Sequence, residues 1–337
     1  MPKVKCCGDI RRLSAHKSLN DLGNTGANLM MRLVVLLLMI AAAQAEAQEW
    51  PDIRTVPADL TVPEMTTMEP AAGRRVRRVL DAPSSAAEAK SNSVYHSLYL
   101  PSDWDRTQHY PIIVELPGNG GYRDVLGDEC SGRPEGCSLG YGITGGEKFI
   151  WLCLPFLNDS GDDLAIQWWG TSPQYRPDST IRYLKAAIDD ACHNFRGRRD
   201  QIVLCGFSRG AIACNAIGLH DDETARLWRA FIVCSHYDGV RSWPFPDSDK
   251  ASARQRLERL GDRPQFICGE RDQVESTRRY LADVFPAPDS STSDQRLSDP
   301  RFTITSTGFR NHNDRWVLRP SEPRTQLKEW LGSVVRE

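Results

Sequence analysis

The stretch that decides the fold of this chain is Ile202-Val203-Leu204-Cys205-Gly206-Phe207-Ser208-Arg209-Gly210. Its first four residues are apolar and of strand length, and residues 211–219 continue with the apolar spacing of a helix. The two glycines allow a sharp turn from strand to helix, in which larger side chains would clash with neighbouring backbone. Such a turn leaves the hydroxyl of Ser208 accessible at the C-terminal edge of a sheet.

Apolar runs of strand length recur on both sides of this turn, at residues 93–100, 110–116, 149–154, 230–234, 264–268 and 301–306. Helical patterns lie between most of them, the clearest beginning near residue 178 with apolar residues at three- and four-residue spacing. Further helices are predicted after Ser208, around residues 274–285 and over 323–335. This alternation predicts an α/β fold in a single domain, with a mostly parallel central sheet and helices on both faces.

The N-terminal region differs from the rest of the chain. Met31-Arg32 is followed by an apolar run at 33–40 and by Ala-Gln-Ala at 43–45, which predicts a signal peptide over 31–47. The run is shorter than the roughly 20 residues that a membrane span needs, although a short anchor with a cytoplasmic tail is the alternative. We therefore expect residues 1–30 to be a mis-assigned extension, 48–92 an extended arm and 93–337 the folded domain. The mature protein would be secreted or periplasmic, without stable membrane insertion.

Composition excludes several classes of function. The 337 residues carry a net charge of −2, so no basic surface predicts binding to nucleic acid. Neither a CxxC nor an HExxH pattern occurs, and the GxGxxG match at 140–145 precedes a strand instead of following one. We therefore expect no metal and no cofactor. Among the cysteines, Cys130 and Cys137 could pair, whereas Cys153, Cys205, Cys234 and Cys268 lie in apolar runs as buried hydrophobes.

A serine hydroxyl is a weak nucleophile at neutral pH and needs a base, which follows it in the chain order serine, acid, histidine. Three histidines follow Ser208, and His220 is expected too far away, at the end of the helix that the serine begins. His312 lies in a polar loop between the last predicted strand and the final helix, and is our predicted base. His236 follows the strand 230–234 and is predicted to line the substrate pocket, with the role of base as its alternative.

The acid that orients the histidine should follow a strand beyond the serine. Asp272 comes just after the strand 264–268 and is our prediction, and Asp238, after the strand 230–234, is the alternative.

A tetrahedral intermediate needs two donors for its oxyanion. The amide of Arg209, directly after the serine, is predicted to supply one, and Asn119 or Gly120, in a glycine-rich loop after the strand 110–116, the other. Trp168 and Trp169 are candidates for an aromatic wall of the substrate site, with plain packing as the alternative.

From about Val94 to the C-terminus the chain resembles a known group of enzymes. The resemblance rests on Tyr99-Leu100-Pro101, on residues 110–118, on the serine turn and on His312. These are similar to secreted α/β-hydrolases of the polyhydroxybutyrate depolymerase, feruloyl esterase and prolyl-oligopeptidase-like kind. The resemblance implies an α/β-hydrolase fold and hydrolysis of carboxylic esters, often on plant polysaccharides or polyesters, without a cofactor. The chain departs from the group at Pro117, which occupies the place of a usual histidine.

The hypothesis with most support is therefore a serine esterase that forms an acyl-enzyme on Ser208. Its substrate would be a small-molecule ester or an ester linked to a polysaccharide or polyester. A peptidase or amidase of the same fold is the first alternative. The second is a hydrolase homologue without activity that binds carbohydrate or a partner.

Overall fold

A computed structural model describes residues 50–80, 93–286 and 299–335 of the chain. The predicted signal peptide at 31–47 and the extension at 1–30 lie outside these residues, so secretion stays a prediction. Within the described stretches, no helix combines the length and the apolar character needed to cross a lipid bilayer.

Eight strands of the described chain form one sheet in the order β1-β2-β6-β3-β7-β8-β9-β10. Strand β2 runs antiparallel to both of its neighbours, and the remaining pairs are parallel. The mostly parallel sheet predicted from the sequence is confirmed. The strands are β1 (Arg75–Arg78), β2 (His96–Tyr99), β3 (Tyr110–Leu116), β6 (Ile150–Cys153), β7 (Gly197–Phe207), β8 (Ala230–Cys234), β9 (Gln265–Gly269) and β10 (Phe302–Ser306).

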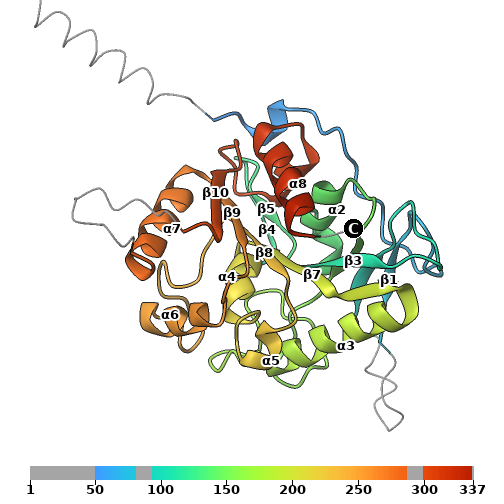
Figure 1. Ribbon diagram of the computed structural model, residues 1–337, viewed down its shortest axis with the longest axis horizontal. Helices are drawn as coiled ribbons and strands as arrows, with labels where there is room; N and C mark the ends of the chain where they lie inside the picture. Colours follow the sequence, from blue (N-terminus) through green and yellow to red (C-terminus); the bar gives the residue numbers. More distant parts are fainter. Residues whose placement is uncertain (1–49, 81–92, 287–298, 336–337) are drawn as a thin grey trace, which may run out of the picture. The chain divides into compact units, whose positions relative to one another are not determined.

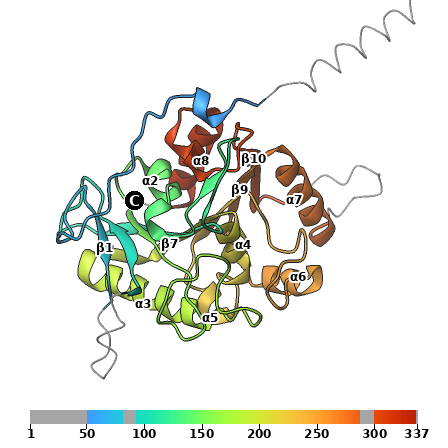
Figure 2. The same ribbon diagram turned by 180° about the vertical axis from the view of Figure 1, so that it is seen from behind.

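Helices cover both faces of the sheet (Figure 1), as the alternation of strands and helices predicted. One face packs against α3, α4 and α7, and the other against α2 and α8, and the same two layers are seen from behind in Figure 2. The division follows from the pleat, because Ile112 and Val114 of β3 point to the first layer and Ile113 to the second. The helices are α2 (Leu139–Thr144), α3 (Asp178–Phe195), α4 (Arg209–Ala216), α5 (Asp222–Ala225), α6 (Lys250–Glu258), α7 (Arg271–Val284) and α8 (Glu322–Val334).

The register of the parallel strands brings several loops to one edge of the sheet. Leu116 of β3 lies opposite Gly206 of β7, Phe207 opposite Cys234 of β8, and Cys234 opposite Cys268 of β9. The chain leaves β3, β7, β8, β9 and β10 at this edge. In open α/β sheets, ligands bind at this carboxyl edge.

Two features depart from the sequence expectations. The segment expected to be an extended arm contributes β1, whose Arg75 is buried against the ring of Trp151, with 4.6 Å from the guanidinium carbon to the ring centroid. An arginine-rich strand has too little apolar alternation to be recognised from sequence. The expected Cys130–Cys137 pair is also wrong, because Cys137 forms a disulfide with Cys153 and Cys130 is free. Residues 134–139 turn Cys137 toward the second core layer, where Cys153 of β6 lies.

Candidate active site

Ser208 lies in a strained turn between β7 and α4. Its φ of 54° and ψ of −112° are conformations that side-chain-bearing residues adopt at a cost of about 1–3 kcal/mol. A Cβ at Gly206 would overlap with the carbonyl of Gly210, and a Cβ at Gly210 with the carbonyl oxygen of Leu116. Only glycine therefore allows this close crossing of strand and helix, which holds the serine hydroxyl at the sheet edge.

Three side chains form a continuous hydrogen-bonded relay from this serine. The Oγ of Ser208 lies 3.0 Å from Nε2 of His312, and Nδ1 of His312 lies 3.0 Å from Oε1 of Glu270. Because Nδ1 faces a carboxylate, it carries the ring proton in the neutral imidazole, which leaves Nε2 free to accept from Ser208. This tautomer is the one that can remove a proton from the serine.

The acid of this relay is Glu270, and the prediction of Asp272 was wrong. Glu270 directly follows β9 and is the residue before α7, so its carboxylate points back across the sheet edge. Asp272 lies in the first turn of α7 and is exposed. The alternative, Asp238, is committed elsewhere, since its buried carboxylate forms an ion pair with Arg256 at 2.8 Å.

Ser235, which the sequence analysis missed, completes the surroundings of the acid. Its hydroxyl donates to Oε2 of Glu270 at 2.8 Å and lies 2.8 Å from Nδ1 of His312, so it touches both partners. It follows β8 directly, and its position at a strand end was the available signal. Burial on its own raises the pKa of Glu270, but the hydrogen bond and charge of His312 outweigh burial, and the pKa lies below its usual value.

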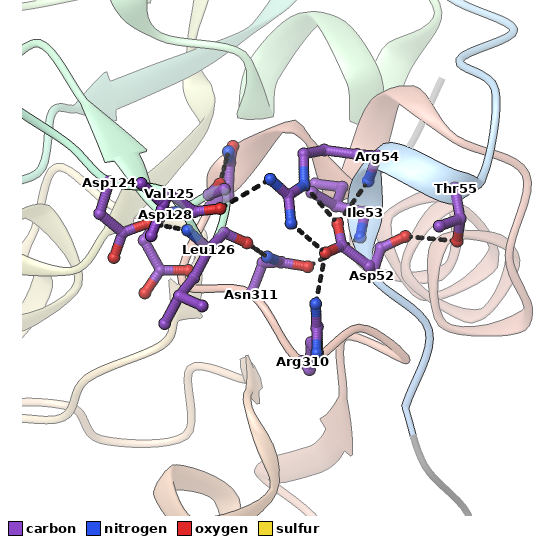
Figure 3. A network of polar contacts seen from close by, with 12 residues as sticks. Asp52, Ile53, Arg54, Thr55, Asp124, Val125, Leu126, Asp128, Arg310 and Asn311 are labelled. Carbon is purple, nitrogen blue, oxygen red and sulfur yellow. Dashed lines mark hydrogen bonds and ion pairs between the residues drawn. The ribbon is translucent and has the colours of Figure 1, made fainter.

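The loop that carries His312, residues 307–313, is held from two sides (Figure 3). Asn311 accepts a hydrogen bond from the amide of Ile53 at 2.7 Å and donates to the carbonyl of Leu126 at 2.5 Å. The amide of His312 itself donates to Asp128 at 2.8 Å. Asp52 joins this network because Arg310 donates to its carboxylate. Residues 50–55, far away in sequence, therefore help to place the imidazole.

A buried pair of carboxylates lies beside this loop. Asp314 and Glu115 both accept from the amide of Ser138, at 3.1 and 3.2 Å. Burial, reinforced by the negative charge of Glu115, raises the pKa of Asp314 to about 8. Asp314 is therefore protonated at neutral pH.

The three amides predicted as oxyanion donors differ in whether they already have a hydrogen-bond acceptor. The amide of Gly120 is already used, since it donates to the carbonyl of Ile166 at 2.7 Å. The amides of Asn119 and Arg209 have no hydrogen-bond acceptor among the described residues, and that of Arg209 is in the first turn of α4. The side chain of Asn119 accepts from the amide of Trp168 at 2.8 Å, which fixes the loop. Of the three predicted donors, Asn119 and Arg209 are thus the two whose amides have no acceptor within the described chain.

The guanidinium of Arg209 binds the neighbouring segment, residues 165–168. It is fully buried, donates to the carbonyl oxygens of Ala165 (3.0 Å) and Trp168, and lies over the ring of Phe156 at 4.1 Å. Burial lowers the pKa of Arg209 to about 9. Trp168 therefore contacts both residues: its carbonyl accepts from Arg209 and its amide donates to Asn119. Through Trp168, Arg209 links the serine turn to the loop after β3.

Aromatic rings surround His312. Phe207 and His236 lie 4.6 and 5.1 Å from it between ring centroids. Of the two tryptophans proposed for the substrate wall, Trp169 is 2% exposed and packs in the core, whereas Trp168 is partly exposed and contacts Trp243 at 5.5 Å. His220 is exposed near Asp221, away from this site. No group of three or more metal-ligating side chains occurs in the described part of the chain.

A mostly parallel sheet whose serine turn follows a central strand, with acid and histidine after it in that order, defines an α/β-hydrolase fold. No family model and no curated protein matches the sequence. Three solved structures are among those similar to this chain. A thermostable esterase is 15% identical, with a TM-score of 0.42 over 72% of this chain and 60% of that chain.

The second, a fungal esterase from Rhizomucor miehei, is 12% identical, with a TM-score of 0.43 over 77% of this chain and 82% of that chain. The third, a fluorophosphonate-binding serine hydrolase from Staphylococcus aureus, is 12% identical, with a TM-score of 0.44 over 79% of this chain and 100% of that chain. The chain thus spans 60% of the length of the first of these proteins.

Proposed function

We propose that this chain hydrolyses carboxylic esters through an acyl-enzyme, with Ser208, His312 and Glu270 as the catalytic triad. The observation that carries the proposal is the unbroken relay of two 3.0 Å contacts that ends on a serine in a strained turn. Ser208 is 6% exposed, and the side chains of His312 and Glu270 are 22% and 17% exposed. The relay is thus shielded from water while the serine remains at the sheet edge.

The reaction follows from this arrangement. The Oγ of Ser208 attacks the ester carbonyl as Nε2 of His312 takes its proton, and Glu270 stabilises the imidazolium that forms. The amides of Arg209 and Asn119 would bind the oxyanion. When the intermediate collapses, His312 passes the proton to the leaving alkoxide, and the alcohol departs. Water then attacks the acyl-enzyme by the same route and releases the acid.

Esters are placed ahead of the peptidase and amidase alternative for a chemical reason. An alkoxide leaves a tetrahedral intermediate more readily than an amide anion does, so an amide depends more on protonation of its leaving group and an ester makes the smaller demand on this relay. A relay with each partner in hydrogen-bonding reach also argues against a homologue that only binds carbohydrate.

Labelling with a fluorophosphonate probe tests the proposal. The folded protein should form one adduct, located by peptide mass spectrometry on Ser208, and should hydrolyse aryl acetates, whereas Ser208→Ala should do neither. A panel of aryl acetates, feruloyl esters and peptide anilides separates esterase from peptidase. Labelling without any hydrolysis of esters would overturn the substrate class, and folded protein that neither labels nor hydrolyses would overturn the enzyme.

A further inference from the structure

A row of three side chains extends from the relay along the loop after β8. The ring of His236 lies 5.1 Å from that of His312, and Trp243 lies 5.3 Å beyond His236, between ring centroids. The guanidinium carbon of Arg241 lies over the Trp243 ring at 4.1 Å. All three belong to one segment, residues 236–243, and none of them takes part in the relay.

Two ring nitrogens of this row lack a hydrogen-bond partner. Nδ1 of His236 and Nε1 of Trp243 are buried and have no hydrogen-bond partner among the described residues. A buried polar atom without a partner costs about 1–3 kcal/mol, so two of them beside a catalytic histidine need a reason. Bound substrate would supply one by satisfying both.

The row carries a positive charge, that of Arg241. Within the described residues, Arg241 forms no ion pair or hydrogen bond, whereas nearby Glu270 is already bound by His312 and Ser235. Burial, and after it the positive charges of His312 and Arg241, lower the pKa of His236 to about 4. His236 is therefore neutral, and Arg241 is the lasting positive charge of the row. The face of Trp243 holds its guanidinium in place, which reduces the entropy lost on binding.

We propose that Arg241, Trp243 and His236 form a subsite for a carboxylate-bearing part of the ester substrate. The inference rests on the proposed ester hydrolysis and narrows its substrate class to anionic esters. Arg241 would pair with the carboxylate, Trp243 and His236 would bind its oxygens or neighbouring polar groups, and the scissile carbonyl would lie at Ser208. A charge-assisted hydrogen bond of this kind corresponds to a preference of about 10-fold over an uncharged ester.

Two pairs of esters test the subsite, one for each side of the scissile bond. For the acyl side, 4-nitrophenyl hemiadipate is compared with 4-nitrophenyl heptanoate, since two rings separate Arg241 from His312 and a long chain is needed. For the alcohol side, 4-acetoxybenzoate is compared with 4-acetoxybenzamide. The measured quantity is the ratio of kcat/KM for the charged and uncharged member of each pair, after subtraction of spontaneous hydrolysis.

The wild-type ratio should be about 10 in one pair, should fall toward one in Arg241→Gln and should shrink as salt is added. Arg106→Gln is the matched control, because Arg106 is an exposed arginine over a tryptophan ring, that of Trp104, in the loop before β3. It should keep the wild-type ratio. Hydrolysis of the uncharged esters with ratios that Arg241→Gln leaves unchanged in both pairs would overturn the subsite alone. No hydrolysis of any of the four esters, with no fluorophosphonate label, would overturn the proposed function and the subsite with it.

Discussion

Replacing Glu270 with glutamine should slow ester hydrolysis by three to four orders of magnitude. The imidazolium that forms on His312 would lose a negative charge now 3.0 Å from its Nδ1. At that separation and an effective dielectric constant of about 20, Coulomb's law gives about 5.5 kcal/mol, which corresponds to a factor of about 10⁴ in rate. The amide oxygen of glutamine can still accept the Nδ1 hydrogen bond, so the geometry is retained and about 10³ is the lower expectation.

The assay is steady-state hydrolysis of an aryl acetate by wild type, Glu270→Gln and Asp272→Asn. Because Glu270 does not reach the substrate, kcat should fall with little change in KM, and the rate of fluorophosphonate labelling should fall in parallel. Asp272→Asn should stay within about twofold of wild type, since Asp272 is exposed. A glutamine variant within 10-fold of wild type, or an asparagine variant slower than the glutamine one, would refute the assignment of the acid.

Three further outcomes are expected. Asp314, whose pKa is raised to about 8, stays protonated while the unfolded chain ionises near pH 4. Stability is therefore lost as pH rises from about 4 to about 8, and Asp314→Asn should remove this loss, which amounts to about 4 kcal/mol between the two assay conditions of pH 5 and pH 8, in urea unfolding. Gly210→Ala should lower the free energy of unfolding by about 3 kcal/mol or more in the same assay, because its Cβ overlaps with the carbonyl of Leu116. Asn311→Ala should lower kcat about 10-fold by releasing the His312 loop from residues 53 and 126.

Each of these has a control in the same chain. Gly332→Ala introduces a Cβ that meets nothing within 4 Å and should not destabilise the protein, so equal losses at 210 and 332 would contradict the steric argument. Asn194→Ala removes an exposed asparagine bonded to Asp190 and should leave kcat unchanged. An Asp314→Asn variant with the same pH dependence as wild type would show that another group causes the loss of stability.

The sheet could be predicted from the sequence because its central strands are continuous apolar runs. Strands β3, β7, β8 and β9 are buried on both faces, so their residues needed no alternation to be recognised. Strand β1 could not be found, because its charged Arg75 is buried by contacts with Trp151 and Ser97 that only the fold creates. The pattern of apolar residues does not predict a strand when contacts with distant residues bury a charged side chain.

The candidate site divides in the same way. Ser208 and His312 follow from local signals, a glycine-flanked serine and a histidine between the last strand and the last helix. The choice between Glu270 and Asp272 depends on where α7 begins: Glu270, extended and just before the helix, faces the imidazole, whereas Asp272 in its first turn is exposed. Likewise, only the structure shows that the amide of Gly120 is already bonded to Ile166 while that of Asn119 is not.

The contact between Ile53 and Asn311 joins positions 258 residues apart, so the two ends of the described chain meet at the loop of His312. Contacts of such long sequence separation form late, since the loop between them must close first. A polypeptide still emerging from the ribosome has residues 50–55 and its serine turn long before it has the imidazole of His312. The relay would therefore be assembled only once nearly the whole chain has been synthesised, and its reactivity would begin only with the completed fold.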